Sequence, residues 1–259
     1  MPDRRVAFIT GATGIARATA IELARHGHQV GVMARTQEDV EETVRLVEEA
    51  GSEAIPSPGD VTNEDDLVRA YDAIQERWGR LDVVFANAGI NGKWAPIEEI
   101  DRSDWEKVIS INLTGTFLTV KHAVPHLKHS GGGSIIITSS VNGTRMFSNT
   151  GASPYASTKA AQVAFAKMMA LELAPDHIRV NVICPGMIET SIEESTERRH
   201  FEEAQYPVEY PAGKLPLTHG EAGRAEDVAR LVSFLASDDA RLITGTPVWI
   251  DGAQSLFMG

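Results

Sequence analysis

A tyrosine and a lysine four residues apart form the most chemically suggestive pair in this sequence. They lie in "SPYASTK" (153–159), where Tyr155 and Lys159 would share one face of a helix that begins near residue 153. A tyrosine phenol titrates near pH 10, and an ammonium group within a few ångströms favours the phenolate. The pair therefore suits general acid/base chemistry. An ordinary surface pair explains the same spacing, and the two residues alone do not separate these interpretations.

The elements that would position this pair alternate between strands and helices. The strand candidates are continuous apolar runs, typical of parallel strands covered on both faces; they span residues 5–10, 28–34, 53–57, 81–87, 134–140, 179–185 and 246–251. Capping signatures predict helix starts at Thr36, Thr62 and Ser103. This alternation predicts an α/β fold, a doubly wound parallel sheet of about seven strands. We expect a single domain over residues 1–259, with the charged, proline-rich stretch at about 187–222 as a substrate lid.

Composition narrows the class of protein. The chain has 259 residues, 24 Lys+Arg and 36 Asp+Glu, so its net charge of −12 argues against nucleic acid or an anionic membrane as a partner. The single cysteine, Cys184, lies in an apolar run, which favours a buried structural thiol. The first residues lack a signal-peptide layout and no apolar stretch reaches 18 residues, so we expect a cytoplasmic protein.

Ligands bind beyond the carboxyl ends of the strands in doubly wound folds, so the strand ends are informative. The first strand ends in a glycine turn, where Gly11 and Gly14 would let backbone amides approach a phosphate. Simple chain reversal is the other use of such a turn. Arg35 follows the second strand without a nearby carboxylate, so it would pair with a ribose 2′-phosphate or remain solvated. Asp60 follows the third strand, where it would accept from an adenine amino group or cap the next helix.

The later strand ends carry small and polar residues that face the same mouth. Asn87, Ala88 and Gly89 follow the fourth strand, Ser139 and Ser140 end the fifth, and Pro185 and Gly186 end the sixth. Asn112 lies among apolar neighbours, where it would make a structural hydrogen bond or hold a water molecule. The eight histidines show no metal-ligand spacing, so no metal is expected.

Taken in order, these motifs resemble the short-chain dehydrogenases/reductases over nearly the whole chain. The ordered set comprises a glycine turn, "DV", "NAG", "INLTGTF", "SSVNG", "YASTK", "RVNVICPG" and a final "DG". The resemblance implies a Rossmann-like, NAD(P)-dependent oxidoreductase that transfers hydride between the cofactor and an alcohol or carbonyl carbon. It also implies a homo-oligomer, a tetramer or dimer, that acts on a small molecule.

The resemblance also implies roles for individual residues. Tyr155 would be the general acid/base, Lys159 would lower its pKa and hold the nicotinamide ribose, Ser140 would bind the substrate oxygen, and Asn112 would hold a proton-relay water. The cofactor would contact Gly11, Thr13, Gly14, Ile15, Arg35, Asp60, Val61, Asn87, Ala88, Gly89, Tyr155, Lys159, Pro185, Gly186, Ile188 and Thr190. Arg35 favours NADP, with NAD as the alternative.

Two departures from the family pattern stand out. Only Ala12 and Thr13 separate the first two glycines, so the turn is one residue shorter than usual, and Ala16 replaces the third glycine. The segment between Ser140 and Tyr155 is slightly longer than usual, and this insert borders the expected substrate pocket. The first departure bears on the cofactor and the second on the substrate.

Residues around the expected mouth suggest a sugar, polyol or hydroxy/oxo acid as substrate. The substrate candidates are Asn91, Asn142, Arg145 and Met187, with further candidates at Trp94, Phe147, Arg198, Arg199, His200, Tyr206 and Tyr210. A charged lid that is merely solvated, and a 3-oxoacyl thioester as substrate, are the alternatives. A non-catalytic nucleotide-binding sensor or scaffold is an alternative of another class, against which the complete set of Asn112, Ser140, Tyr155 and Lys159 argues.

Overall fold

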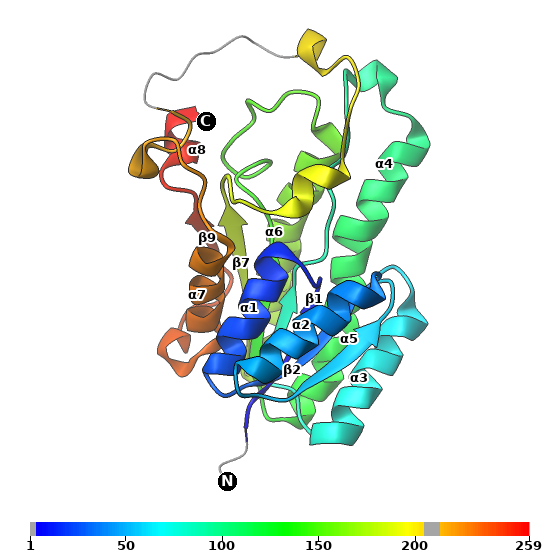
Figure 1. Cartoon of the computed structure of the whole chain (residues 1–259), viewed down its shortest axis with the longest axis vertical. Coiled ribbons are helices and arrows are strands. Elements are labelled where there is room, and N and C mark those ends of the chain that lie inside the picture. Colours follow the sequence, from blue (N-terminus) through cyan, green and yellow to red (C-terminus); the bar gives the residue numbers. More distant parts are fainter. Residues whose placement is uncertain (1–3, 205–212, 259) are drawn as a thin grey trace.

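Seven parallel strands form the central sheet of the chain, as seen in a computed structural model that describes residues 4–204 and 213–258. The strands lie in the order β3-β2-β1-β4-β6-β7-β9. Figure 1 shows the sheet enclosed between helices. Their bounds are β1 Val6–Thr10, β2 Gln29–Ala34, β3 Ala54–Pro58, β4 Val83–Ala86, β6 Gly133–Thr138, β7 Ile178–Pro185 and β9 Pro247–Ile250. The order reverses between β1 and β4, which creates a crevice at the carboxyl ends of these strands. The predicted α/β fold is confirmed.

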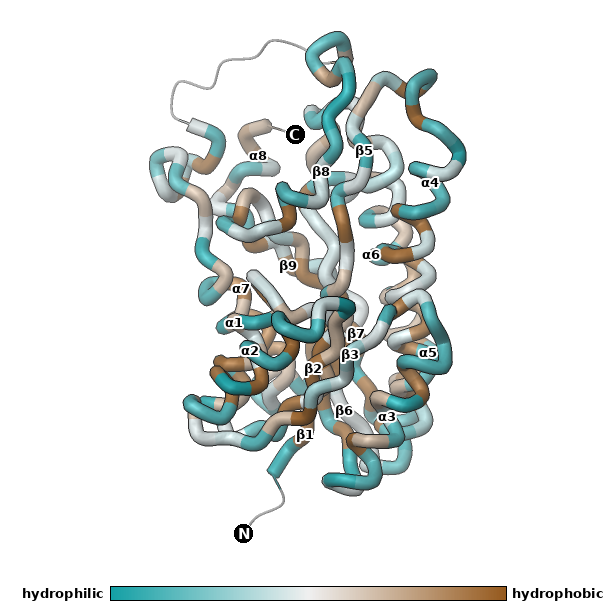
Figure 2. Tube along the Cα trace, turned by 45° about the vertical axis from the view of Figure 1, so that its right-hand side comes forward, coloured by the Kyte–Doolittle hydropathy of each residue, from teal (hydrophilic) through white to brown (hydrophobic). Residues whose placement is uncertain are grey.

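Helices cover both faces of the sheet. One face packs against α1 (Gly14–Arg25), α2 (Gln37–Glu49) and α7 (Ala225–Ala236), and the other against α3 (Glu64–Trp78), α5 (Gly115–His129) and α6 (Ser153–Leu173). Side chains alternate between the two cores, and in β1 Ala7 and Ile9 enter the first core while Val6 and Phe8 enter the second. Both faces of the sheet are buried, so the residues that point to either face are apolar. This explains why the strands are continuous apolar runs in the sequence. Figure 2 shows hydrophobic residues gathered along the central strands and polar residues along the outer loops.

The helices begin at or near the residues predicted from the capping signatures, but the N-cap residue differs in two of the three. Thr36 is the N-cap of α2, as predicted. The cap of α3 is Asn63, whose side chain accepts from the first turn, because Thr62 donates its hydroxyl to Asp60 instead. The cap of α4 (Arg102–Ile109) is Asp101, two residues before the predicted start. No helix in the described part of the chain is both long and apolar enough to cross a membrane.

A second, two-stranded sheet was not predicted from the sequence. The strand β5 (Gly92–Trp94) pairs in parallel with β8 (Thr196–Arg198). This pairing joins the loop after β4 to the segment 187–222, whose other described elements are short 3₁₀ turns at 191–195, 201–204 and 216–218. Strands of three residues carry too few side chains to show a period. The predicted pocket residues Tyr206 and Tyr210 lie outside the described residues.

Candidate active site

A cavity of about 640 Å³ lies at the carboxyl ends of the central strands, where the strand order reverses. All of the predicted cofactor contacts line it: Gly11, Thr13, Gly14, Ile15, Arg35, Asp60, Val61, Asn87, Ala88, Gly89, Tyr155, Lys159, Pro185, Gly186, Ile188 and Thr190. The catalytic candidate Ser140 also lines the cavity. The structure therefore brings together strand ends that are far apart in the sequence.

The glycine turn presents free backbone amides to this cavity. Gly11 and Gly14 have positive φ angles of 104° and 51°, a conformation that favours glycine. A Cβ on Gly11 would lie 3.0 Å from the Cβ of Ala16, so the methyl group of Ala16 fills the space behind the turn. The N–H groups of Gly14 and Ile15 donate to no group among the described residues, and the first turn of α1 holds no acidic residue. These donors at a helix N-terminus fit a diphosphate.

The far end of the cavity has the features of an adenosine site. Arg35 is exposed there and makes no hydrogen bond or ion pair with the described residues. The carboxylate of Asp60 accepts from the N–H and the hydroxyl of Thr62, which fixes its orientation. A Cβ on Gly115 would come within 2.7 Å of Val61, so this glycine allows α5 to lie close behind Val61.

Threonine hydroxyls connect the ends of three neighbouring strands. The hydroxyl of Thr10 at the end of β1 accepts from the N–H groups of Asn87 and Ala88, at 3.0 and 3.2 Å. Thr138 at the end of β6 donates to the side-chain oxygen of Asn87 at 3.0 Å. These bonds hold the chain after β4 in place beneath the expected cofactor. Thr10 and Thr138 were not predicted, although their position as last residues of apolar strands was a usable signal.

Asn112 lies behind the cavity rather than in it, and its side chain is fully buried. It sits in a π-helical turn at 110–114, a distortion common at functional sites. Its side chain accepts from the N–H of Ile90 and donates to the carbonyl of Ile90 and to Thr158. Its own carbonyl accepts from Thr116 and Gln162. Asn112 therefore anchors the loop after β4, and its role with a relay water stays a prediction.

Ser140, Tyr155 and Lys159 meet at the inner end of the cavity. Both Tyr155 and Lys159 are buried in the first two turns of α6, and the Lys159 Nζ lies 5.3 Å from the centroid of the tyrosine ring. The ammonium group donates to the carbonyl of Thr138 at 2.9 Å. The Ser140 hydroxyl accepts from the N–H of Asn142 at 3.1 Å, and it lies close enough to the Tyr155 hydroxyl to lower the pKa of the phenol. Two hydroxyl groups thus converge where a reacting oxygen would bind.

Burial, rather than the neighbouring ammonium, dominates the protonation of this pair. It raises the pKa of Tyr155 to about 12, against the opposing effect of the Ser140 hydrogen bond. Burial also lowers the pKa of Lys159 to about 8. The expectation that Lys159 brings the pKa of the phenol below its ordinary value is wrong for the unliganded chain, because desolvation of the phenolate is the largest effect on that pKa. At neutral pH the phenol holds its proton.

The substrate candidates divide into those that reach the cavity and those that do not. Asn91, Asn142 and Met187 line it. Arg145 does not, because its exposed guanidinium stacks 3.5 Å from the centroid of the Trp249 ring. Its assignment to the substrate site is not supported by this geometry.

The further candidates divide in the same way. Trp94 and Arg198 line the cavity, whereas Phe147 is exposed outside it. Arg199 and His200 also lie outside and both pair with Glu99. Lining residues that were not predicted include Thr36, Asp39, Ile111, Val141, Met146, Asn149, Ile192, Glu193, Ser195, Phe201, Lys214, Gln254 and Met258. Gln254 and Met258 belong to no recognisable sequence motif, so only their position in the cavity lining identifies them.

The comparisons with known proteins agree with this geometry. A family model described as Enoyl-(Acyl carrier protein) reductase matches residues 10–253. A putative short-chain type dehydrogenase/reductase of Mycolicibacterium smegmatis is 36% identical over 278 residues and is covered over 98% of both chains. The chain belongs to the short-chain dehydrogenase/reductase family. This result confirms the resemblance found in the sequence.

Two solved structures of this dehydrogenase/reductase family are similar over almost their whole length. A 3-ketoacyl-ACP reductase from Sinorhizobium meliloti 1021 is 50% identical with a TM-score of 0.93, over 97% of this chain and 99% of that chain. A carveol dehydrogenase from Mycobacterium avium in complex with NAD is 31% identical with a TM-score of 0.86, over 97% and 98%. This family member is therefore an NAD(P)-dependent oxidoreductase acting on CH–OH or carbonyl groups. Among the described residues, no group of three or more His, Cys, Asp or Glu side chains is arranged to hold a metal ion.

The lowered pKa of Lys159 predicts how the stability of the unliganded dehydrogenase/reductase depends on pH. The folded-state pKa of about 8 lies below the ordinary 10.5, so between these values the unfolded chain binds more protons. The contribution of Lys159 to the free energy of unfolding should therefore rise by roughly 2–3 kcal/mol between about pH 7.5 and 10, opposed above about pH 9 by the buried Cys184, whose pKa burial raises to about 11. The difference in the free energy of unfolding between the wild type and Lys159→Met should change by this amount over the window. Urea unfolding at each pH measures it.

Lys167→Met is the matched control, because Lys167 lies on the same helix and is exposed. It should leave the wild-type pH dependence in place. Parallel pH curves for the wild type and Lys159→Met would contradict the prediction.

Proposed function

We propose that the chain interconverts an alcohol and a carbonyl compound by hydride transfer, with Tyr155 as general acid/base. The position of Ser140 and Tyr155 in the lining of one cavity, with the buried Lys159 5.3 Å from the centroid of the tyrosine ring, carries this proposal. The free amides of Gly14 and Ile15 support it at the other end, where they suit the diphosphate of a dinucleotide. A cavity with a phosphate site at one end and a proton donor at the other fits a nicotinamide cofactor and a small substrate together.

The nicotinamide cofactor supplies or receives the hydride when bound. In the direction of reduction, negative charge develops on the substrate oxygen, and Tyr155 donates its proton to that oxygen. Ser140 donates a hydrogen bond to the same oxygen, where the charge develops. The raised pKa of Tyr155 keeps the phenol protonated for this step. In oxidation the steps run in reverse, and the Lys159 ammonium stabilises the phenolate that must take up the proton.

We propose NADP as the favoured cofactor, with NAD as the alternative that a related structure contains. Arg35 is exposed at the adenosine end and has no partner among the described residues, so its planar guanidinium is available to a 2′-phosphate. No carboxylate stands at the end of β2 to accept from a ribose 2′-hydroxyl.

For the substrate, the lining favours a neutral, oxygen-rich compound such as a sugar or polyol. Asn91, Asn142 and Asn149 line the cavity. Asn149 donates to the side-chain oxygen of Asn142 and Asn91 donates to Thr196, so each amide keeps further polar capacity for a substrate. Arg198 is paired with Glu193, which weakens the argument for an anionic hydroxy or oxo acid. A 3-oxoacyl thioester is the second candidate. The 50% identity to a 3-ketoacyl-ACP reductase favours it, as do the apolar lining residues Trp94, Met146, Phe201 and Met258.

Replacing Tyr155 by phenylalanine tests the proposed function. The variant Tyr155→Phe lacks the proton donor, so kcat/KM should fall by at least about 10²-fold in both directions, while the Kd of the cofactor changes little. Absorbance of the reduced cofactor measures turnover, and calorimetric titration measures binding.

The control is Tyr71→Phe, which removes a buried hydroxyl that donates to the Thr119 carbonyl far from the cavity. It should lower stability by about 1 kcal/mol and leave turnover unchanged. Undiminished turnover by Tyr155→Phe would refute the proposed role of this residue.

Removing the guanidinium of Arg35 tests the cofactor assignment. The variant Arg35→Ala should weaken NADPH binding about tenfold and NADH binding less than twofold, because only NADPH carries the 2′-phosphate. Titration of the unliganded protein with each cofactor gives the two Kd values. Equal losses for both cofactors would remove the argument for NADP.

A substrate panel separates the remaining alternatives. Sugars, polyols and 3-oxoacyl thioesters would each be scored by the absorbance change of the nicotinamide cofactor. We expect turnover of sugars or polyols, and turnover of acyl thioesters alone would overturn this preference. Tight cofactor binding without turnover of any compound would favour a non-catalytic sensor instead.

A further inference from the structure

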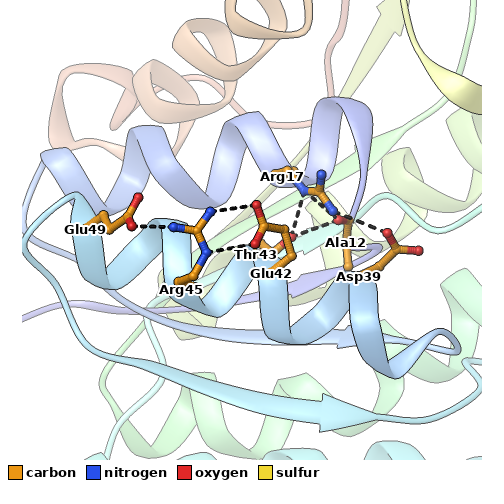
Figure 3. A network of polar contacts seen from close by, with 7 residues as sticks. All are labelled: Ala12, Arg17, Asp39, Glu42, Thr43, Arg45 and Glu49. Carbon is orange, nitrogen blue, oxygen red and sulfur yellow. Dashed lines mark hydrogen bonds and ion pairs between the residues drawn. The ribbon is translucent and has the colours of Figure 1, made fainter.

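Arg17 spans the gap between the glycine turn and α2 (Figure 3). It extends from the first turns of α1, and its Nε donates to the Ala12 carbonyl at 3.1 Å and to the Thr43 hydroxyl at 3.0 Å. Thr43 donates to the same carbonyl at 2.8 Å. The outer nitrogen of Arg17 pairs with the Asp39 carboxylate at 3.3 Å. One guanidinium therefore holds both the shortened glycine turn and an acidic residue of α2.

Asp39 is the part of this network that borders the cofactor cavity. It lines the cavity beside Thr36 and Arg35, at the end that fits the adenosine. Its side chain is 38% exposed, whereas that of Arg17 is 29% exposed and is not part of the cavity lining. A free carboxylate at this end would repel a 2′-phosphate and would accept a hydrogen bond from an unphosphorylated ribose. The ion pair offsets that charge.

We propose that Arg17 determines cofactor specificity by neutralising Asp39, so that the adenosine end of the cavity accepts a phosphorylated ribose. The inference rests on the proposed cofactor site, and it concerns how far Arg17 shifts the ratio of the NADH and NADPH affinities toward NADPH. Asp60, the other carboxylate at this end, is hydrogen-bonded by Thr62 and has no arginine partner among the described residues. Arg17 acts on the cofactor through Asp39 and is in that sense a positioning residue.

The competing explanation is that Arg17 only braces the glycine turn through the Ala12 carbonyl. A loosened turn would weaken both cofactors equally, because NADH and NADPH share the diphosphate. A freed Asp39 charge would weaken NADPH selectively. The two explanations therefore differ in the ratio Kd(NADH)/Kd(NADPH), which calorimetric titration of the unliganded protein at low salt measures directly.

The experiment compares Arg17→Met, Asp39→Asn and the double variant with the wild type. We expect the ratio to fall about threefold to tenfold in Arg17→Met, to return to the wild-type value or above in the double variant, and to rise in Asp39→Asn. The fall should shrink at about 1 M salt, because screening acts on charge repulsion across this partly exposed site. A purely structural role of Arg17 would produce none of these ratio changes.

Two control variants isolate the effect. Arg45→Met removes one positive charge, as Arg17→Met does, but from α2. Arg45 pairs with Glu42 and Glu49 and is not part of the cavity lining, so the ratio of the two Kd values should not change (Figure 3). Thr43→Val removes the second donor to the Ala12 carbonyl and one acceptor of Arg17, but it keeps the charge and leaves Arg17 its bonds to Ala12 and Asp39, so any loss should be equal for both cofactors.

The outcomes decide the inference as follows. An unchanged ratio in Arg17→Met, or a lowered ratio that the double variant does not restore, would overturn it. If Arg17→Met does not fold by circular dichroism, Asp39→Asn decides alone, and a ratio that fails to rise overturns the inference. Wild-type protein that binds neither cofactor would overturn the proposed function as well, whereas binding with a ratio insensitive to these variants would overturn only the role of Arg17.

Discussion

The hydrogen bond from the buried Lys159 ammonium to the Thr138 carbonyl joins the acid/base helix to the central sheet. Burying an ammonium group is unfavourable unless it is hydrogen-bonded, and the end of β6 supplies the acceptor. The hydroxyl of Ser139, next along the chain, donates back to the Lys159 carbonyl at 2.7 Å. These two bonds fix the position of α6 relative to the end of β6, and so they place Tyr155 near Ser140. The convergence of two hydroxyls therefore depends on the sheet edge as much as on the helix.

The same edge organises the cofactor half of the cavity through small polar side chains. Thr10 and Thr138 hold the chain after β4 from two neighbouring strands, and Asn112 holds it from behind through Ile90. Gly89 lies between these anchors, and a Cβ there would come within 3.2 Å of the Asn112 side chain. The floor of the cavity is thus rigid because several strand ends share one hydrogen-bond network. The polar groups of this floor hydrogen-bond to other parts of the chain. The remaining lining residues are the ones available to a cofactor and a substrate.

The glycine turn is held differently, by side chains from two helices, α1 and α2. The shortened turn and Ala16 raised a question about the shape of the turn, and in the structure Ala16 packs against Gly11 while Arg17 of α1 and Thr43 of α2 both hold the Ala12 carbonyl. Because Thr43 braces the glycine turn from α2, and Arg17 of α1 contacts both the Ala12 carbonyl and Asp39, the charge on the first turn of α2 and the shape of the glycine turn are coupled.

The sequence by itself determined the order and type of the main elements, the glycine turn and the Tyr155–Lys159 pair. These features depend on periodicity and backbone preference over a few residues, which a single chain displays directly. Tertiary structure alone decided that Arg145 stacks on Trp249, that β5 pairs with β8, and that burial raises the pKa of Tyr155. It also decided that Arg17 meets Thr43 and Asp39. Partners so far apart in the chain are selected by packing and desolvation, and no local pattern records which side chains the fold will bring into contact.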